Sequence, residues 1–140
     1  MTHNFKDYPE LTNNQMQFYY FDSPHKQITE DFTAEVVGVH DGDTIRVKWN
    51  ERDFTFPIRF SDTAAPEINT FEGRAAQSYM QNRILGKNVD VIIDPNNRVD
   101  KWGRLLAIIT EGGSDVGEEL IMKGMATRWE DRNDDQSLDI

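Results

Sequence analysis

The feature that most constrains the fold is an alternation of apolar and polar residues that begins at Phe32. Alternation over residues 32–39 and 45–49 predicts two half-buried strands, because successive side chains of a strand point to opposite faces. The residues between these strands, 40–43, have the sequence His-Asp-Gly-Asp, which is typical of a tight turn. A polar turn then leads into a third alternating segment, residues 54–61. The three segments predict an antiparallel meander.

The rest of the chain predicts two helices and two more strands. Residues 72–85 change to helical spacing, and Gly86 stands where such a helix would end. Strands are predicted at residues 88–93 and 105–110, followed by a short capped helix within residues 115–124. Five strands with a helix between the third and the fourth match the OB-fold, a five-stranded Greek-key barrel. We therefore expect an α+β fold, a β-barrel plus helices.

Length and composition predict one domain with two flanking segments. A chain of 140 residues with 37% hydrophobic residues suits a single core. The barrel is expected over residues 33–129, an N-terminal extension over residues 1–32 and an acidic tail over residues 130–140. The extension contains an aromatic cluster, Phe18–Phe21. We expect this cluster to cover part of the barrel as a strap, with base stacking as the less favoured alternative.

Composition also excludes several classes of function. The chain has no cysteine, which excludes disulfides, thiolate zinc sites and a cysteine nucleophile, so a metal would bind mainly to oxygen. No leader pattern and no membrane-spanning apolar run is visible, so the expected location is cytoplasmic. The net charge of −10 opposes tight binding of nucleic acid, but residues 1–32 contribute −3 and residues 130–140 contribute −4. The barrel itself is therefore only mildly acidic.

Four short segments carry the candidate chemistry. Asp41-Gly42-Asp43-Thr44 joins the first two strands, Arg59 lies in the third, Ala65-Pro66-Glu67 follows it, and Asp100-Lys101-Trp102-Gly103-Arg104 precedes the fifth. Any one of these charged residues alone is more often solvated surface than a functional group. Their order and spacing from Thr33 to about Arg128 resemble the staphylococcal nuclease family, including the eight-residue interval from Arg59 to Glu67.

The resemblance implies a calcium-dependent nuclease that acts on DNA and RNA. Asp43 would bind Ca²⁺, Arg59 and Arg104 would bind the scissile phosphate, and Glu67 would be the general base. The resemblance also implies that Lys101 and Trp102 contact the substrate, and that cleavage leaves 3′ phosphates. These residue types suit the chemistry, because Ca²⁺ prefers oxygen ligands, arginine binds phosphate bidentately and a carboxylate can accept a proton from water.

One position departs from the family pattern. The family has a second aspartate ligand where this chain has Ala64, and the nearest carboxylate, Asp62, lies two residues earlier. A β-bulge at Thr63 or Ala64 would return Asp62 to the cation, because bulges re-aim side chains. The metal set is therefore expected to be Asp43, Asp62 and the carbonyl of Ala65, with a weaker or altered site as the alternative.

A non-catalytic OB-fold module that binds nucleic acid or protein is the competing hypothesis. The presence of Arg59, Glu67 and Arg104 together favours the enzyme. The expected partners are DNA and RNA, with single-stranded or flexible substrates preferred. Secreted members of the family carry a third helix after the region of Trp129, so either the N-terminal strap or an inhibitor or partner subunit is expected to cover that surface.

Overall fold

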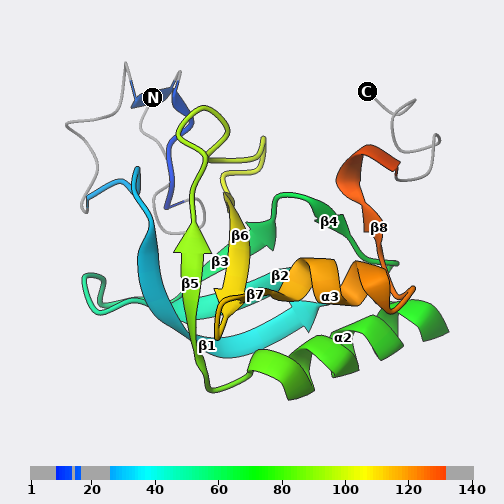
Figure 1. Ribbon diagram of the computed structural model, residues 1–140. Coiled ribbons are helices and arrows are strands. Elements are labelled where there is room, and N and C mark those ends of the chain that lie inside the picture. Colours follow the sequence, from blue (N-terminus) through cyan, green and yellow to red (C-terminus); the bar gives the residue numbers. More distant parts are fainter. Residues whose placement is uncertain (1–8, 14, 17–25, 132–140) are drawn as a thin grey trace.

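A computed structural model describes residues 9–13, 15–16 and 26–131 of the chain. Its centre is a closed barrel of five strands, β1 (Phe32–Asp41), β2 (Thr44–Lys48), β3 (Phe56–Phe60), β5 (Asn88–Ile92) and β6 (Leu105–Glu111) (Figure 1). Antiparallel pairing runs in the order β3, β2, β1, β5, β6, and a parallel pairing of β3 with β6 closes the barrel. The predicted OB-type barrel is confirmed.

Two helices lie side by side against the barrel (Figure 1), α2 (Phe71–Ile84) and α3 (Val116–Met122). Both begin with a side-chain cap of the kind that helix starts favour. The Thr70 hydroxyl accepts a hydrogen bond from the amide of Gly73, and the Asp115 carboxylate accepts one from the amide of Glu118. Gly86 and Gly124, both at positive φ, follow the two helices. The predicted helix positions are confirmed to within a few residues.

The barrel interior is formed by the apolar side of the predicted alternation. Phe56, Ile58 and Phe60 are all buried and meet the inward residues of the other strands. Phe54, which was expected to begin the third strand, instead lies before β3 and is only partly buried. The preceding turn extends through residues 53–55, so the strand is shorter than its sequence pattern.

Short elements that the sequence analysis missed connect the barrel to the chain after α3. β4 (Thr63–Ala64) pairs with β8 (Thr127–Arg128), and β7 (Ser114–Asp115) pairs with the end of β6. A 3-10 turn, η2 (Trp129–Asp131), follows β8, and the Trp129 amide donates a hydrogen bond to the carbonyl of Asp62 at 2.8 Å. These contacts hold Trp129 beside the end of β3.

The described part of the N-terminal extension is packed against the barrel. Leu11 and Ile28 are both buried, and Ile28 belongs to the main core. The cluster Phe18–Phe21, the expected strap, lies outside the described residues. Within the part of the chain that the structure describes, no helix has the length and apolar character needed to cross a membrane.

Candidate active site

Asp43 lies at the centre of the polar site, in the turn between β1 and β2, and is only 7% exposed. Its Oδ2 atom accepts hydrogen bonds from the Ala65 amide at 2.9 Å and from Arg59 Nη2 at 3.3 Å. Its Oδ1 atom accepts one from the Thr44 hydroxyl at 3.1 Å. One carboxylate therefore connects the β1–β2 turn, β3 and the loop after β4.

The turn has this shape because of its aspartate and its glycine. The Asp41 carboxylate accepts a hydrogen bond from the Asp43 amide at 3.1 Å, which is how aspartate commonly stabilises a turn. A Cβ atom on Gly42 would lie 2.9 Å from the Cβ atoms of both Ala65 and Ala76. Only glycine lets the turn pack this closely against α2 and the loop before Glu67.

Burial, together with the neighbouring Asp41 carboxyl, raises the pKa of Asp43 to about 6, although Arg59 partly opposes the shift. The pKa of Asp41 behaves differently. Burial would raise it, but hydrogen bonds with Asp43 and His40 hold it below its ordinary value. The pair thus contains one carboxyl whose negative charge is poorly compensated, so Asp43 has a raised affinity for a proton or a cation.

Arg59 extends from β3 and is mostly buried, with a side-chain exposure of 12%. Its Nη1 atom donates a hydrogen bond to the carbonyl of Phe60 at 2.8 Å, and its Cζ atom lies 4.1 Å from the ring centre of Trp129. Burial lowers the pKa of Arg59, Asp43 opposes that shift, and the positive charge of Arg104 adds to it. The two guanidinium groups therefore lie close enough to repel each other.

The hairpin of residues 98–106 holds Arg104, and Asp100 organises its tip. The Asp100 carboxylate accepts hydrogen bonds from the amides of Trp102 and Arg104 and from Arg104 Nε at 2.7 Å. Lys101 Nζ lies 4.5 Å from the ring centre of Trp102, which is 55% exposed. Sequence analysis gave Asp100 no role, although the tendency of aspartate to accept hydrogen bonds from the backbone of a turn was a usable signal.

Glu67 is exposed, and its backbone is fixed by the start of α2. The carbonyl of Glu67 accepts hydrogen bonds from the amide and the hydroxyl of Thr70, at 3.0 Å and 2.6 Å. A Cβ atom on Gly73 would lie only 1.7 Å from that carbonyl oxygen, so the loop and the helix touch directly. This contact sets where the Glu67 side chain leaves the loop.

The backbone around Asp62, the expected second metal ligand, differs from the bulge that the sequence analysis predicted. The chain bends at Ser61–Asp62, β4 pairs with β8 in continuous register, and Thr63 turns inward beside Gly117. Asp62 is exposed, and no group of three or more His, Asp or Glu residues gathers in the described part of the chain. The bulge that was to re-aim Asp62 is therefore absent from β4. The role of Asp62 as a ligand stays a prediction.

The fold is a five-stranded OB-type barrel. Its polar site has a buried carboxylate, which suits a cation, and two neighbouring arginines, which suit an anionic ligand. The model of the family described as staphylococcal nuclease homologue matches residues 57–139, more than half of the chain. The chain therefore belongs to the staphylococcal nuclease family, as its motifs predicted. The matched region includes Arg59, Glu67 and Arg104, whereas Asp43 precedes it.

A comparison with a curated relative also supports membership of this family. The chain is similar to a micrococcal nuclease of Shigella flexneri, with 34% identity over 79 residues. The aligned region covers 56% of this chain and 42% of the relative, so the chain spans about two fifths of the relative's length.

Proposed function

We propose that this protein is a nuclease that hydrolyses phosphodiester bonds in DNA and RNA. The observation that carries the proposal is that Arg59 pairs with the buried carboxylate of Asp43 and also lies near the positive charge of Arg104. Membership of the staphylococcal nuclease family and the printed name of the relative support it. Flexible or single-stranded substrates are favoured, because both strands of a stiff duplex limit how closely a phosphate approaches a recessed arginine.

The two arginines would bind the scissile phosphate. Asp100 holds Arg104 through Nε, which leaves the terminal nitrogens of that guanidinium group to face a phosphate. Arginine remains charged at any working pH and matches phosphate oxygens with a planar fork. Negative charge grows on the phosphate as water attacks, and removal of one such donor typically costs about a hundredfold or more in rate.

Glu67 would act as the general base. It lies at the exposed end of a fixed loop, where a water molecule can reach its carboxylate. A water oxygen attacks phosphorus, its proton passes to Glu67, and the bond from phosphorus to the 5′ oxygen breaks. That oxygen takes a proton from solvent, so the products are a 3′ phosphate and a 5′ hydroxyl. General base catalysis of this kind contributes about 10²- to 10⁴-fold.

The carboxylates fit a divalent cation such as Ca²⁺. Asp43 and its neighbour Asp41 offer hard oxygen atoms, and burial leaves the charge of Asp43 poorly compensated, as its raised pKa records. Asp43, the Ala65 carbonyl and Asp62 would hold the ion. When bound, a divalent cation supplies positive charge that polarises a phosphate oxygen. With Ala64 in the place of a carboxylate, the affinity for Ca²⁺ should be lower than in a site with two fixed aspartates.

The test is cleavage of denatured DNA with Ca²⁺, with chelator, and by the Glu67→Gln variant. The matched control is Glu51→Gln, because Glu51 is also an exposed glutamate but lies in the turn at the far end of β2. We expect cleavage that needs Ca²⁺, falls at least about a hundredfold in Glu67→Gln and is unchanged in Glu51→Gln. Cleavage that survives chelation or the Glu67 substitution would reject this mechanism. Binding without cleavage in any divalent metal would favour a non-catalytic OB-fold module.

A further inference from the structure

A buried cluster of charged residues joins the N-terminal segment to the barrel at a distance from the carboxylate site. The Glu10 carboxylate, 1% exposed, forms ion pairs with Arg52, in the turn after β2, and with Arg98, at the base of the 98–106 hairpin. Arg52 and Arg98 are also buried, at 6% and 3% exposed. Burial lowers the pKa of both guanidinium groups, and the charge of Glu10 opposes that shift.

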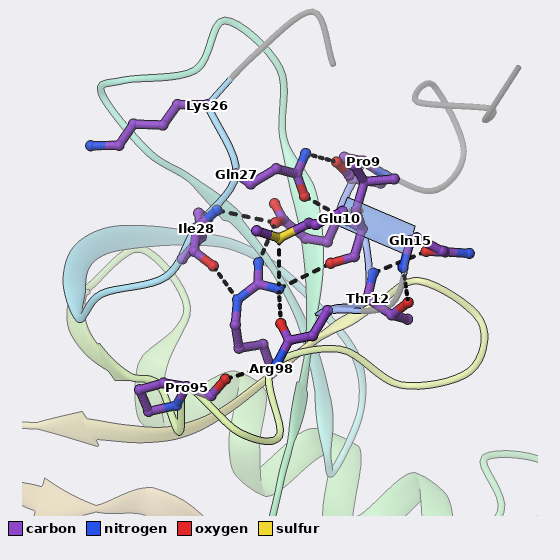
Figure 2. A network of polar contacts seen from close by, with 12 residues as sticks. Pro9, Glu10, Thr12, Gln15, Lys26, Gln27, Ile28, Pro95 and Arg98 are labelled. Atoms are coloured by element: carbon purple, nitrogen blue, oxygen red, sulfur yellow. Dashed lines mark hydrogen bonds and ion pairs between the residues drawn. The ribbon is translucent and has the colours of Figure 1, made fainter. Parts of the chain in front are cut away.

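Arg98 is the centre of this cluster (Figure 2). Its Nε atom donates to the carbonyl of Ile28 at 2.7 Å, and its Nη1 atom donates to the carbonyl of Leu11 at 3.0 Å and to Asn13 Oδ1 at 3.1 Å. Glu10 also accepts a hydrogen bond from the Ile28 amide at 3.2 Å. One guanidinium group thus joins residues 11, 13 and 28 of the N-terminal segment to the hairpin.

The N-terminal segment also contacts the stretch that leads from β5 to the hairpin. Asn13 Nδ2 donates to the carbonyl of Pro95 at 3.2 Å. The Asp31 carboxylate accepts a hydrogen bond from the Ile93 amide at 2.8 Å. Residues 93–97 belong to no strand, so these contacts and Arg98 provide lateral support where the sheet does not.

Backbone hydrogen bonds within the hairpin connect Arg98 to the tip. The Leu106 amide donates to the carbonyl of Arg98 at 2.7 Å, and the Asp100 amide donates to the carbonyl of Arg104 at 2.9 Å. Asp100 then holds Arg104 and the amide of Trp102. Only Val99 separates Arg98 from Asp100, so a displacement of Arg98 would displace Arg104.

We propose that Glu10 is a positioning residue that acts through Arg98 to fix the hairpin carrying Lys101, Trp102 and Arg104. The N-terminal segment then acts as a brace: it holds the hairpin in position for substrate binding, and it is also part of the folded core. The inference rests on the proposed function for its effect on catalysis, whereas the effect on the hairpin itself can be measured without any reaction.

The test compares Glu10→Gln with Glu111→Gln. Glutamine keeps the shape of Glu10 and removes its charge. Glu111 is a matched control, because it also pairs with an arginine, Arg83, but lies at the end of β6 away from the hairpin tip. Hydrogen exchange is measured at the amides of Trp102 and Arg104, both of which donate to Asp100. We expect exchange about tenfold faster in Glu10→Gln and unchanged in Glu111→Gln.

Steady-state kinetics on denatured DNA provide the second measurement. A role limited to stability lowers the folded fraction, which reduces the apparent kcat and leaves KM unchanged. A displaced hairpin instead raises KM, and we expect an increase of about fivefold or more in Glu10→Gln. Unchanged exchange at Trp102 and Arg104 in a folded Glu10→Gln protein overturns the proposal, and so does an unchanged KM in an active one.

A milder variant keeps the test decisive if Glu10→Gln does not fold. Asn13 is exposed, and Asn13→Ala removes its bonds with Arg98 and Pro95 without removing a buried charge. It should speed exchange at Trp102 and Arg104 in the same direction by a smaller factor, about threefold, and no change would overturn the proposal. If the wild-type protein cleaves no nucleic acid, the proposed function fails, while the exchange measurement still decides whether the brace exists.

Discussion

Replacement of Asp43 by asparagine should stabilise the metal-free protein at neutral pH while removing its function. Folding raises the pKa of Asp43 from 3.8 to about 6, so the folded state favours the protonated form. The stability this group contributes is complete below pH 3.8 and is lost as the pH rises through about 6. At about 1.4 kcal/mol per pKa unit, the wild-type protein loses about 3 kcal/mol across this window.

Asparagine resembles the protonated carboxyl and does not titrate. Its amide group cannot accept both sets of hydrogen bonds made by Asp43, which offsets the gain by about 1 kcal/mol. In chelator at pH 8, Asp43→Asn should therefore be more stable than wild type by about 2 kcal/mol, and at pH 4 it should be equal or less stable. Urea unfolding at pH 4, 6 and 8 measures the difference.

The Asp41→Asn variant is the matched control, because its sign is opposite. Hydrogen bonds with Asp43 and His40 lower the pKa of Asp41, so its carboxylate stabilises the fold above its unfolded pKa, and this stability is lost as the pH falls through the lowered value. Asp41→Asn should accordingly be destabilised at pH 8 and less so at pH 4. A stability difference between Asp43→Asn and wild type that is constant from pH 4 to pH 8 would refute the reasoning.

Three further predictions concern other parts of the chain. Hydrogen bonds from Arg83 and Ser114 lower the pKa of Glu119 to about 2. After allowance for partial exposure, Glu119→Gln should lower the free energy of unfolding in urea at pH 7 by about 1 to 2 kcal/mol, and this loss should shrink as the pH falls from 4.5 towards 2. A loss that does not change with pH would contradict the prediction. Gly73→Ala should destabilise the fold by about 2 kcal/mol or more and lower cleavage at least about tenfold, because its Cβ atom would collide with the backbone at Glu67; a stable, fully active variant would contradict this. Ala64→Asp should raise calcium affinity in calorimetry by about tenfold, and an unchanged affinity would reject the inferred ligand position.

Most of the barrel could be predicted from the sequence because its long strands have one buried face. The alternation in β1, β2 and β3 reflects that burial directly, and the caps and glycines marked both helices. The short pairs β4–β8 and β7–β6 could not be predicted in this way. A two-residue strand is too short to show a period, and its existence depends on where distant segments meet.

The candidate site was predictable in its residue types but only partly in its contacts. The antiparallel pairing of Thr44 with Arg59 follows from the meander, and it brings Arg59 to Asp43. The burial of Asp43, which sets its raised pKa, depends on the close contact of Gly42 with α2 and the loop after β4. No local pattern in the sequence records that contact.

The cluster of Glu10, Arg52 and Arg98 was missed because its members are far apart in sequence and each resembles a surface charge. A buried ion cluster is also a weak source of stability, since apolar residues of similar volume often replace one without loss. Here Arg52 Nε and Nη1 form no hydrogen bond within the described chain, so the cluster is not arranged for maximum stability.

The cluster does provide a fixed position for Arg98, through hydrogen bonds of defined direction. Arg98 donates to acceptors from five residues of the N-terminal segment: Ile28, Leu11, Asn13, Met16 and Glu10. Hydrogen bonds of defined geometry fix the base of a hairpin more tightly than apolar contacts, which tolerate sliding. A precise position matters most for a hairpin whose tip carries Arg104. The placement of the hairpin that carries Arg104 therefore accounts for this cluster better than stability does.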